Sequence, residues 1–220
     1  MLTLEDFSET FTRALAAAGD GPPKERSSTV SPRGDHSLNP GMTVPEKIRP
    51  AAVLVPVVGR EGEPTILLTE RSADLPHHAG QVSFPGGRVE ETDADHIDAA
   101  LRETEEEIGL DRRHVEVIGR LDTYFTRTGF VVTPIVGLVR PPFELTPDPV
   151  EVASVFEVPL SFVLDRSNHE RHSREWQNMI RHFYVFPHPE QYIWGATAGM
   201  LVNLAELMLD VMGDGADGAN

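Results

Sequence analysis

The chain has 220 residues, of which 40% are hydrophobic, and its 19 basic and 35 acidic side chains give a formal net charge of −16. A surface of that sign argues against a general nucleic-acid-binding or anionic-membrane-binding function. The chain contains no cysteine, which excludes disulfides, cysteine nucleophiles and thiolate metal sites. Its length suits one well-buried domain, and it shows no basic-apolar leader or long apolar span. We therefore expect a soluble cytoplasmic protein with neither nucleic acid nor membrane as partner.

Residues 2–18 are predicted to form an amphipathic helix, because Leu4, Phe7, Phe11 and Leu15 recur at helical spacing on one face. This apolar stripe has to pack on something. We expect it to dock on the main domain or on a sister subunit, as in a homodimer. The alternative is a loosely attached lid or partner-binding element.

Residues 19–45 are dense in Pro, Gly and Ser and show little apolar periodicity, which predicts a flexible, extended connector. The main domain is expected from 46 to 212, with a disordered tail over 213–220. It should open with a strand at 51–58, whose near-continuous apolar character indicates burial on both faces, and a second strand at 65–70.

A helix is predicted from about Asp95, a suitable N-cap, to Gly109, a suitable C-terminal stop. The rest of the domain mixes strands with short helices. The expected strands are 115–124, 130–139, 150–158 and 176–186, and the expected helices are 159–164 and 193–212, the last with Leu201, Leu204, Ala205 and Met208 inward. Mixed strands flanked by a few helices predict an α/β/α sandwich with a mixed sheet.

Three carboxylates of the predicted helix share one face, because Glu103, Glu106 and Glu107 stand at i, i+3 and i+4. This spacing brings them within reach of a common point, and their mutual repulsion calls for a counter-charge. Oxygen ligands suit a hard divalent cation, of which Mg²⁺ or Mn²⁺ fits best. If the glutamates are taken alone, a solvated acidic helix face is the alternative interpretation.

The residues around this cluster resemble the Nudix box, G-x5-E-x7-R-E-U-x-E-E-x-G-U. Positions 102–110, RETEEEIGL, match its second half, with Thr104 at a usually aliphatic position. In the first half, Asp93 stands six residues after Gly87 in place of the usual glutamate, and the interval to Arg102 is one residue longer than usual. The resemblance implies the Nudix sandwich fold and metal-dependent hydrolysis of a diphosphate.

Just upstream, LLTERS at 67–72 and HAGQVSFPGG at 78–87 resemble the signature of the coenzyme A pyrophosphatase branch of the Nudix family. Members of that branch commonly carry the same one-residue extension in the box. Pro76 stands where the signature usually has arginine. The branch implies cleavage of coenzyme A or its acyl derivatives into 4'-phosphopantetheine (or its acyl form) and adenosine 3',5'-bisphosphate.

The Nudix resemblance implies a role for each residue of the box. The three glutamates would be metal ligands or, for one of them, the group that orients or deprotonates the attacking water. Arg102 would brace the glutamates or the loop, with an ordinary surface arginine as the alternative. Gly86 and Gly87 would turn the backbone tightly near the metal. Glu151 is a further candidate carboxylate, because some Nudix enzymes draw their base from a later segment; a surface strand residue is the alternative.

Candidates for phosphate or adenosine contacts lie in the upstream signature, at Arg71, His78 and Gln81. Arg71 is the strongest because a planar guanidinium suits phosphate, and a cation that met the 3'-phosphate would separate coenzyme A from ADP-ribose and dinucleotides. His77 and His78 are disfavoured as a metal pair, because neighbours in an extended loop point apart and Mg²⁺ prefers oxygen.

The sequence thus leads to a metal-dependent coenzyme A diphosphatase that takes a small nucleotide as substrate. One alternative is a Nudix hydrolase of another nucleoside diphosphate derivative, such as ADP-ribose or a dinucleotide. Another is a non-catalytic module of the same fold that senses a ligand or binds a protein through the N-terminal helix. The presence of all three glutamates and Arg102 counts against the module, because a sensor could drop them.

Overall fold

The computed structural model describes residues 2–18, 33–43, 47–176 and 179–214. Its α-helices are α1 (Leu4–Ala17), α2 (Asp35–Leu38), α3 (His96–Ile108), α4 (Leu160–Leu164) and α5 (Gly195–Asp214). Its strands are β1 (Arg33–Gly34), β2 (Arg49–Val58), β3 (Thr65–Arg71), β4 (Val82–Ser83), β5 (Gly86–Arg88), β6 (Val115–Arg120), β7 (Tyr124–Phe125), β8 (Phe130–Val139), β9 (Val152–Pro159), β10 (Glu170–Trp176), β11 (Met179–Pro187) and β12 (Tyr192–Trp194).

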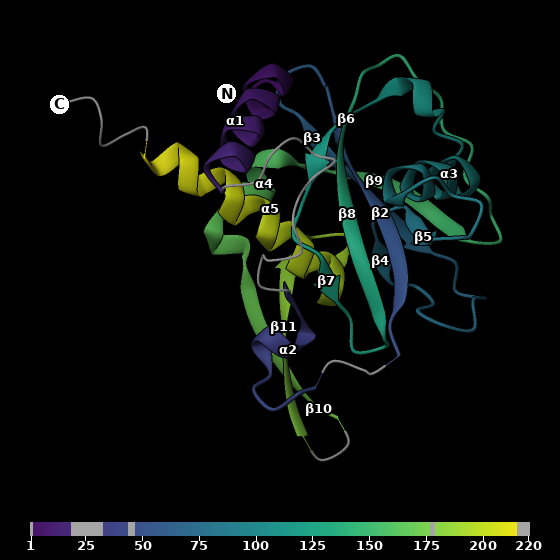
Figure 1. Ribbon diagram of the computed structural model, residues 1–220, viewed down its shortest axis with the longest axis vertical. Coiled ribbons are helices and arrows are strands. Elements are labelled where there is room, and N and C mark those ends of the chain that lie inside the picture. The colour runs from purple at the N-terminus through teal and green to yellow at the C-terminus, as the bar shows by residue number, and fades with distance from the viewer. Residues whose placement is uncertain (1, 19–32, 44–46, 177–178, 215–220) are drawn as a thin grey trace.

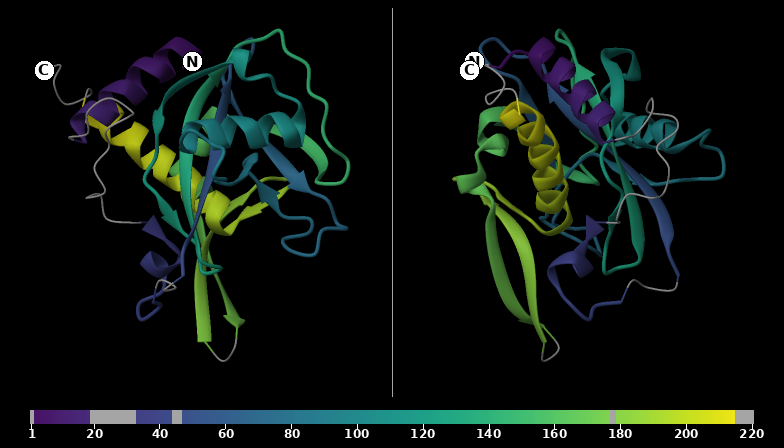
Figure 2. Two further views of the ribbon diagram at one scale, coloured as in Figure 1. Left: turned by 45° about the vertical axis from the view of Figure 1, so that its right-hand side comes forward. Right: turned by 60° about the vertical axis from the view of Figure 1, so that its left-hand side comes forward.

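The large sheet is mixed and is built around β2. This strand pairs in parallel with β8 over its whole length and antiparallel with β3 and β5. β9 pairs with the far edge of β3, and β6 and β7 pair with β8. A second, antiparallel sheet has the order β10-β11-β12, and its β10–β11 hairpin projects from the body (Figure 2).

Two apolar clusters lie on opposite faces of the large sheet. Helix α3 lies on one side of this sheet and α1, α4 and α5 lie on the other (Figure 1). Successive residues of β2 alternate between the two clusters, so that Leu54 packs in the one beneath α3 and Val55 in the other. Burial on both faces explains why β2 is almost continuously apolar. The predicted α/β/α sandwich with a mixed sheet is confirmed.

Helix α1 docks on the domain through the apolar stripe seen in its sequence. Leu4, Phe7, Phe11 and Leu15 are all buried, and the last two pack where a side chain at Gly119 of β6 would otherwise stand. Burying a Leu or Phe side chain stabilises by about 2 kcal/mol, so releasing four together would be costly. The expected docking on the main domain is confirmed, and the stripe needs no sister subunit to cover it. A homodimer stays a prediction.

The expected connector contains ordered structure that its composition did not indicate. Within it, β1 pairs in parallel with β7, and Asp35 of α2 accepts hydrogen bonds from the Tyr124 hydroxyl and the Arg127 backbone N–H. Elements this short show no periodicity, because distant residues hold them in place. The remaining connector residues, 19–32 and 44–46, lie outside the described part of the chain, as does most of the expected tail.

Three late elements differ from expectation. The sequence predicted one strand at 176–186, but β10 precedes it as the other arm of a hairpin. β10 reads ERHSREW and is largely exposed, so it lacks the alternation by which strands are recognised. The predicted strand 115–124 is divided into β6 and β7, and β12 occupies the start of the predicted terminal helix.

Helix α5 is a core helix. Its expected inward residues Leu201, Leu204, Ala205 and Met208 are all fully buried. By length and composition alone the stretch 195–213 would suffice to cross a membrane, but 56% of it is buried inside the fold, where an apolar helix is expected.

Candidate active site

Helix α3 carries the acidic cluster and begins and ends where local sequence predicts. Asp95 caps its N-terminus by accepting hydrogen bonds from the backbone N–H groups of residues 97 and 98, and Gly109 ends it in the left-handed conformation. Ala99, Ala100 and Ile108 are fully buried against the sheet. Thr104 stands at the usually aliphatic position, and its buried hydroxyl is not left without a hydrogen bond, because it donates to the Ala100 carbonyl over 2.6 Å.

The two glycines of β5 bring backbone close to two carboxylates. Gly86 has φ +144°, and a Cβ there would collide with the backbone of β2. Its N–H donates to Oε2 of Glu107 over 3.0 Å. A Cβ on Gly87 would overlap the Glu103 carboxylate. Any larger residue at 86 or 87 would therefore displace strand β2 or one of the glutamates.

Glu107 and Glu103 are carboxylates removed from water, and burial outweighs the arginine beside each of them. Glu107 is 4% exposed, and burial raises its pKa to about 7 against the Gly86 hydrogen bond and the Arg71 charge. Burial also raises the pKa of Glu103, and Arg102 opposes this shift. Glu151 adds a repulsive charge to both. Such an arrangement favours the approach of a cation.

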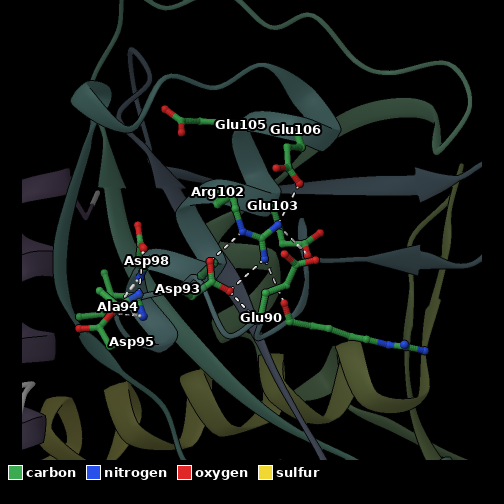
Figure 3. A network of polar contacts seen from close by, with 12 residues as sticks. Glu90, Asp93, Ala94, Asp95, Asp98, Arg102, Glu103, Glu105 and Glu106 are labelled. Atoms are coloured by element: carbon green, nitrogen blue, oxygen red, sulfur yellow. Dashed lines mark hydrogen bonds and ion pairs between the residues drawn. The ribbon is translucent and has the colours of Figure 1, made fainter.

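Arg102 is the centre of the polar network beside these carboxylates (Figure 3). Its Nε and Nη2 donate to the two oxygens of Asp93 over 2.8 and 3.0 Å, and Nη2 also donates to the Arg88 carbonyl over 3.1 Å. Its Nη1 lies 3.0 Å from Glu106 and 3.2 Å from Glu103. The Arg102 hydrogen bonds hold the pKa of Asp93 down to about 2. Arg102 is therefore not an ordinary surface arginine.

Asp93 belongs to this site, although the sequence did not single it out as a site residue. It stands where the box usually has its first glutamate, and its fork-to-fork pair with Arg102 ties the loop after β5 to α3. The interval between the two residues is one longer than usual, yet it still allows a bidentate pair. The available signal was an acid six residues after Gly87.

The expected meeting of three glutamates at one point does not occur. Among the described residues, no three acidic, histidine or cysteine side chains are arranged as a metal-binding group. Glu106 is 61% exposed and turns to Arg102, whereas Glu107 turns inward to Gly86. Helical spacing determines where each Cβ lies, but the partner of each carboxylate determines where its oxygens lie. Glu105 turns away and pairs with Arg112 (Figure 3).

The donor set nevertheless fits a hard divalent cation. The nearby ligands are carboxylates alone, and two of them, Glu103 and Glu107, are partly or fully removed from water. A cation would relieve the repulsion that Glu151 adds to both. Glu103 and Glu107, with Glu106 after release from Arg102 and with Glu151, are therefore the side chains that would hold it.

Of the three candidate residues in the upstream signature, only Arg71 contacts a carboxylate of this site. Arg71, at the end of β3, places Nη1 3.5 Å from Oε1 of Glu107. The loop that follows returns to it, because the Arg71 N–H donates to the Gln81 carbonyl and its own carbonyl accepts from Gly80. The side chains of His78 and Gln81 are paired with each other over 2.9 Å rather than with the carboxylates. The expectation that His77 and His78 do not form a metal pair stays a prediction.

A family model of the NUDIX domain matches residues 47–185, which is more than half of the chain. The chain belongs to the Nudix family. A protein described as "Uncharacterized Nudix hydrolase NudL" from Cronobacter sakazakii is 46% identical over 167 residues, covering 71% of this chain and 81% of that protein. One with the same description from Photorhabdus laumondii is 37% identical over 206 residues, covering 94% and 98%.

Among solved structures, the Nudix hydrolase RenU from M. smegmatis aligns with a TM-score of 0.48 and 19% identity over 74% of this chain and 86% of its own.

Nudix enzymes hydrolyse nucleoside diphosphate derivatives, which are small-molecule nucleotides, and generally use divalent metal ions. This chain is accordingly a Nudix pyrophosphohydrolase. The acidic cluster on α3, with Arg102, lies within the matched residues.

The raised pKa of Glu107 predicts a pH-dependent stability. The metal-free native state keeps a proton on Glu107 up to about pH 7, whereas a glutamate in the unfolded chain loses it near pH 4.5. Because the native state binds more protons in this window, the free energy of unfolding should fall as pH rises from about 4.5 to about 7, by up to about 3 kcal/mol.

The measurement is urea unfolding in chelator at pH 5 and pH 7.5 for the wild type and Glu107→Gln. We expect the wild type to lose more stability than the variant between the two pH values. The comparison cancels contributions of opposite sign from carboxylates such as Asp93, whose pKa is lowered. Equal pH dependence in the two proteins would contradict the prediction.

Proposed function

We propose that this enzyme hydrolyses the diphosphate of coenzyme A or acyl-coenzyme A, using Mg²⁺ or Mn²⁺. The products are 4'-phosphopantetheine, or its acyl form, and adenosine 3',5'-bisphosphate. The observation that supports this most is the contact between Arg71 and Glu107. It joins the two segments that matter: the residues at 67–87 that resemble the coenzyme A signature, and the catalytic box on α3.

The chain's own residues have distinct tasks in this reaction. A bound cation supplies charge neutralisation at the diphosphate oxygens and lowers the pKa of the attacking water. Glu103 and Glu107 would hold that cation, and a carboxylate of the cluster accepts the proton that the water loses. Asp93 anchors Arg102, which in turn positions Glu103 and Glu106. Water adds to one phosphorus, and the bridging oxygen leaves with the other product.

A substrate panel with product analysis tests the proposal. Coenzyme A, an acyl-coenzyme A, ADP-ribose and a dinucleotide would be compared at equal Mg²⁺. We expect the highest kcat/KM for coenzyme A or its acyl form, with adenosine 3',5'-bisphosphate as a product. A preference for ADP-ribose or the dinucleotide would show another Nudix specificity. No turnover of any substrate would favour a sensing or binding module.

Arg71→Ala is expected to weaken hydrolysis of coenzyme A and dephospho-coenzyme A equally. The sequence alone suggested that Arg71 meets the 3'-phosphate, but its guanidinium lies 3.5 Å from Glu107, beside the carboxylates that serve the diphosphate. Losing a charged contact costs about 1.5 to 3 kcal/mol, or roughly ten- to a hundred-fold in kcat/KM.

The measurement is kcat/KM for both substrates, with Arg60→Ala as control. Arg60 is paired with Glu157 and should leave both rates near wild type. If kcat/KM fell for coenzyme A alone, Arg71 would instead contact the 3'-phosphate.

A further inference from the structure

Two arginines share one aromatic ring at the end of the large sheet where β2 and β8 begin. Phe130 is the first residue of β8, and its neighbour across the sheet is Arg49. The guanidinium of Arg49 lies over the Phe130 ring, 4.1 Å from its centroid. That of Arg88, the last residue of β5, lies over the same ring at 5.6 Å. The ring is thus a platform that orients two cations.

Neither cation has an acidic partner among the residues that the structure describes. Nη2 of Arg49 donates a hydrogen bond to the Thr128 carbonyl over 2.8 Å. The Arg88 side chain makes no hydrogen bond to a described residue. The arginines on α3 and in the diphosphate site, by contrast, are paired with carboxylates. Two like charges over one ring repel each other. In a chain with 35 acidic side chains, leaving such a pair free of carboxylates favours an anionic ligand.

The arginine pair adjoins the diphosphate site but lies on the other face of the sheet. Gly87 packs against the Glu103 carboxylate on the α3 side. Arg88 follows it and is opposite Ala51, which belongs to the apolar cluster on the α5 side. The Arg88 carbonyl accepts from Arg102, so the strand that carries this cation is tied to the catalytic network. This backbone contact connects the arginine pair to the site of the diphosphate.

We propose that Arg49 and Arg88, oriented by Phe130, bind the 3'-phosphate of the adenosine half of the substrate and so determine specificity. The inference rests on the proposed function and deepens it. The diphosphate itself is served by the carboxylates and Arg71, which leaves a second phosphate for this pair. A base does not stack on Phe130 here, because a guanidinium already covers the ring. Each guanidinium retains in-plane N–H donors, the geometry that suits a phosphate.

The test is calorimetric titration of the full-length protein in Mg²⁺ with adenosine 3',5'-bisphosphate and with AMP, which lacks the 3'-phosphate. Neither ligand has a diphosphate that the enzyme could cleave. The variants are Arg49→Gln, Arg88→Gln and the control Arg13→Gln. Arg13 is an exposed arginine of α1 with no ion pair to a described residue, so its loss changes the net charge by the same amount.

We expect the wild type to bind the bisphosphate more tightly than AMP. Arg49→Gln and Arg88→Gln should each weaken bisphosphate binding about ten-fold or more while changing AMP binding less than about two-fold. Arg13→Gln should change neither. Phe130→Leu, which removes the platform and keeps both charges, should weaken bisphosphate binding by a smaller factor. Melting temperatures near wild type would show that the variants are folded.

The proposal is overturned if the wild type shows no preference for the bisphosphate, or if the arginine variants lose both nucleotides equally. These outcomes are separate from the fate of the proposed function. Suppose that the enzyme does not cleave coenzyme A, but the arginine variants lose the preference for the bisphosphate over AMP. The proposed function is then refuted, and the phosphate site stands. Efficient cleavage of coenzyme A by both arginine variants, with an unchanged ratio to dephospho-coenzyme A, would refute the site and keep the function.

Discussion

Glu107→Gln and Glu106→Gln are expected to lower kcat by roughly a hundred-fold or more without unfolding the protein. Each change removes one negative charge where a cation must be held. The buried amide of Glu107→Gln can still accept the Gly86 hydrogen bond, and Glu106 is 61% exposed, so neither change opens a cavity. Steady-state kinetics at saturating Mg²⁺, with circular dichroism to verify the fold, is the measurement.

Glu105→Gln is the matched control on the same helix. Glu105 immediately precedes Glu106 in sequence, but its carboxylate pairs with Arg112 and turns away from Arg102 (Figure 3). The control should therefore keep near-normal turnover while losing the same charge. If both test variants also kept near-normal turnover, the catalytic site would lie elsewhere.

Removal of divalent cations is expected to abolish turnover, and Mg²⁺ or Mn²⁺ should restore it. Glu103 and Glu107 by themselves repel a diphosphate, and the nearby arginines, Arg102 at Glu103 and Arg71 at Glu107, are already paired with them. The measurement is activity after chelation and after stepwise addition of each metal. Substantial hydrolysis in excess chelator would falsify the metal requirement.

A second measurement separates cation binding from catalysis. A ligand that binds only the native state raises the melting temperature, and at a given concentration the rise is larger the tighter the ligand binds. Mg²⁺ should therefore raise the melting temperature of the wild type more than that of Glu107→Gln. An equal rise in the two proteins would place the stabilising cation away from this carboxylate.

Much of the fold was predictable because its signals are local. The caps of α3 at Asp95 and Gly109 and the limits of β8 at 130 and 139 follow from neighbouring residues and from hydrophobic periodicity. The same holds for the stripe of α1, whose spacing predicted an amphipathic helix with a face to bury, although not whether the main domain or a sister subunit covers it. Local signals are absent from the polar strand β10, which the sequence did not predict. They are also absent from the short elements β1 and α2, where the sequence predicted a connector without regular structure.

By itself, the sequence determined helix α3, the presence of the acidic cluster and of the glycine pair, and the membership of the family, because these are patterns along the chain. Tertiary structure alone decided that Glu107 is buried and Glu106 exposed, that Asp93 pairs with Arg102, and that Arg71 reaches Glu107 from β3. It also brought Arg49 and Arg88 onto Phe130 from three strands. The physical reason is that spacing along an element determines which face a residue occupies, whereas hydrogen-bond partners, burial and charge come from segments far away in sequence.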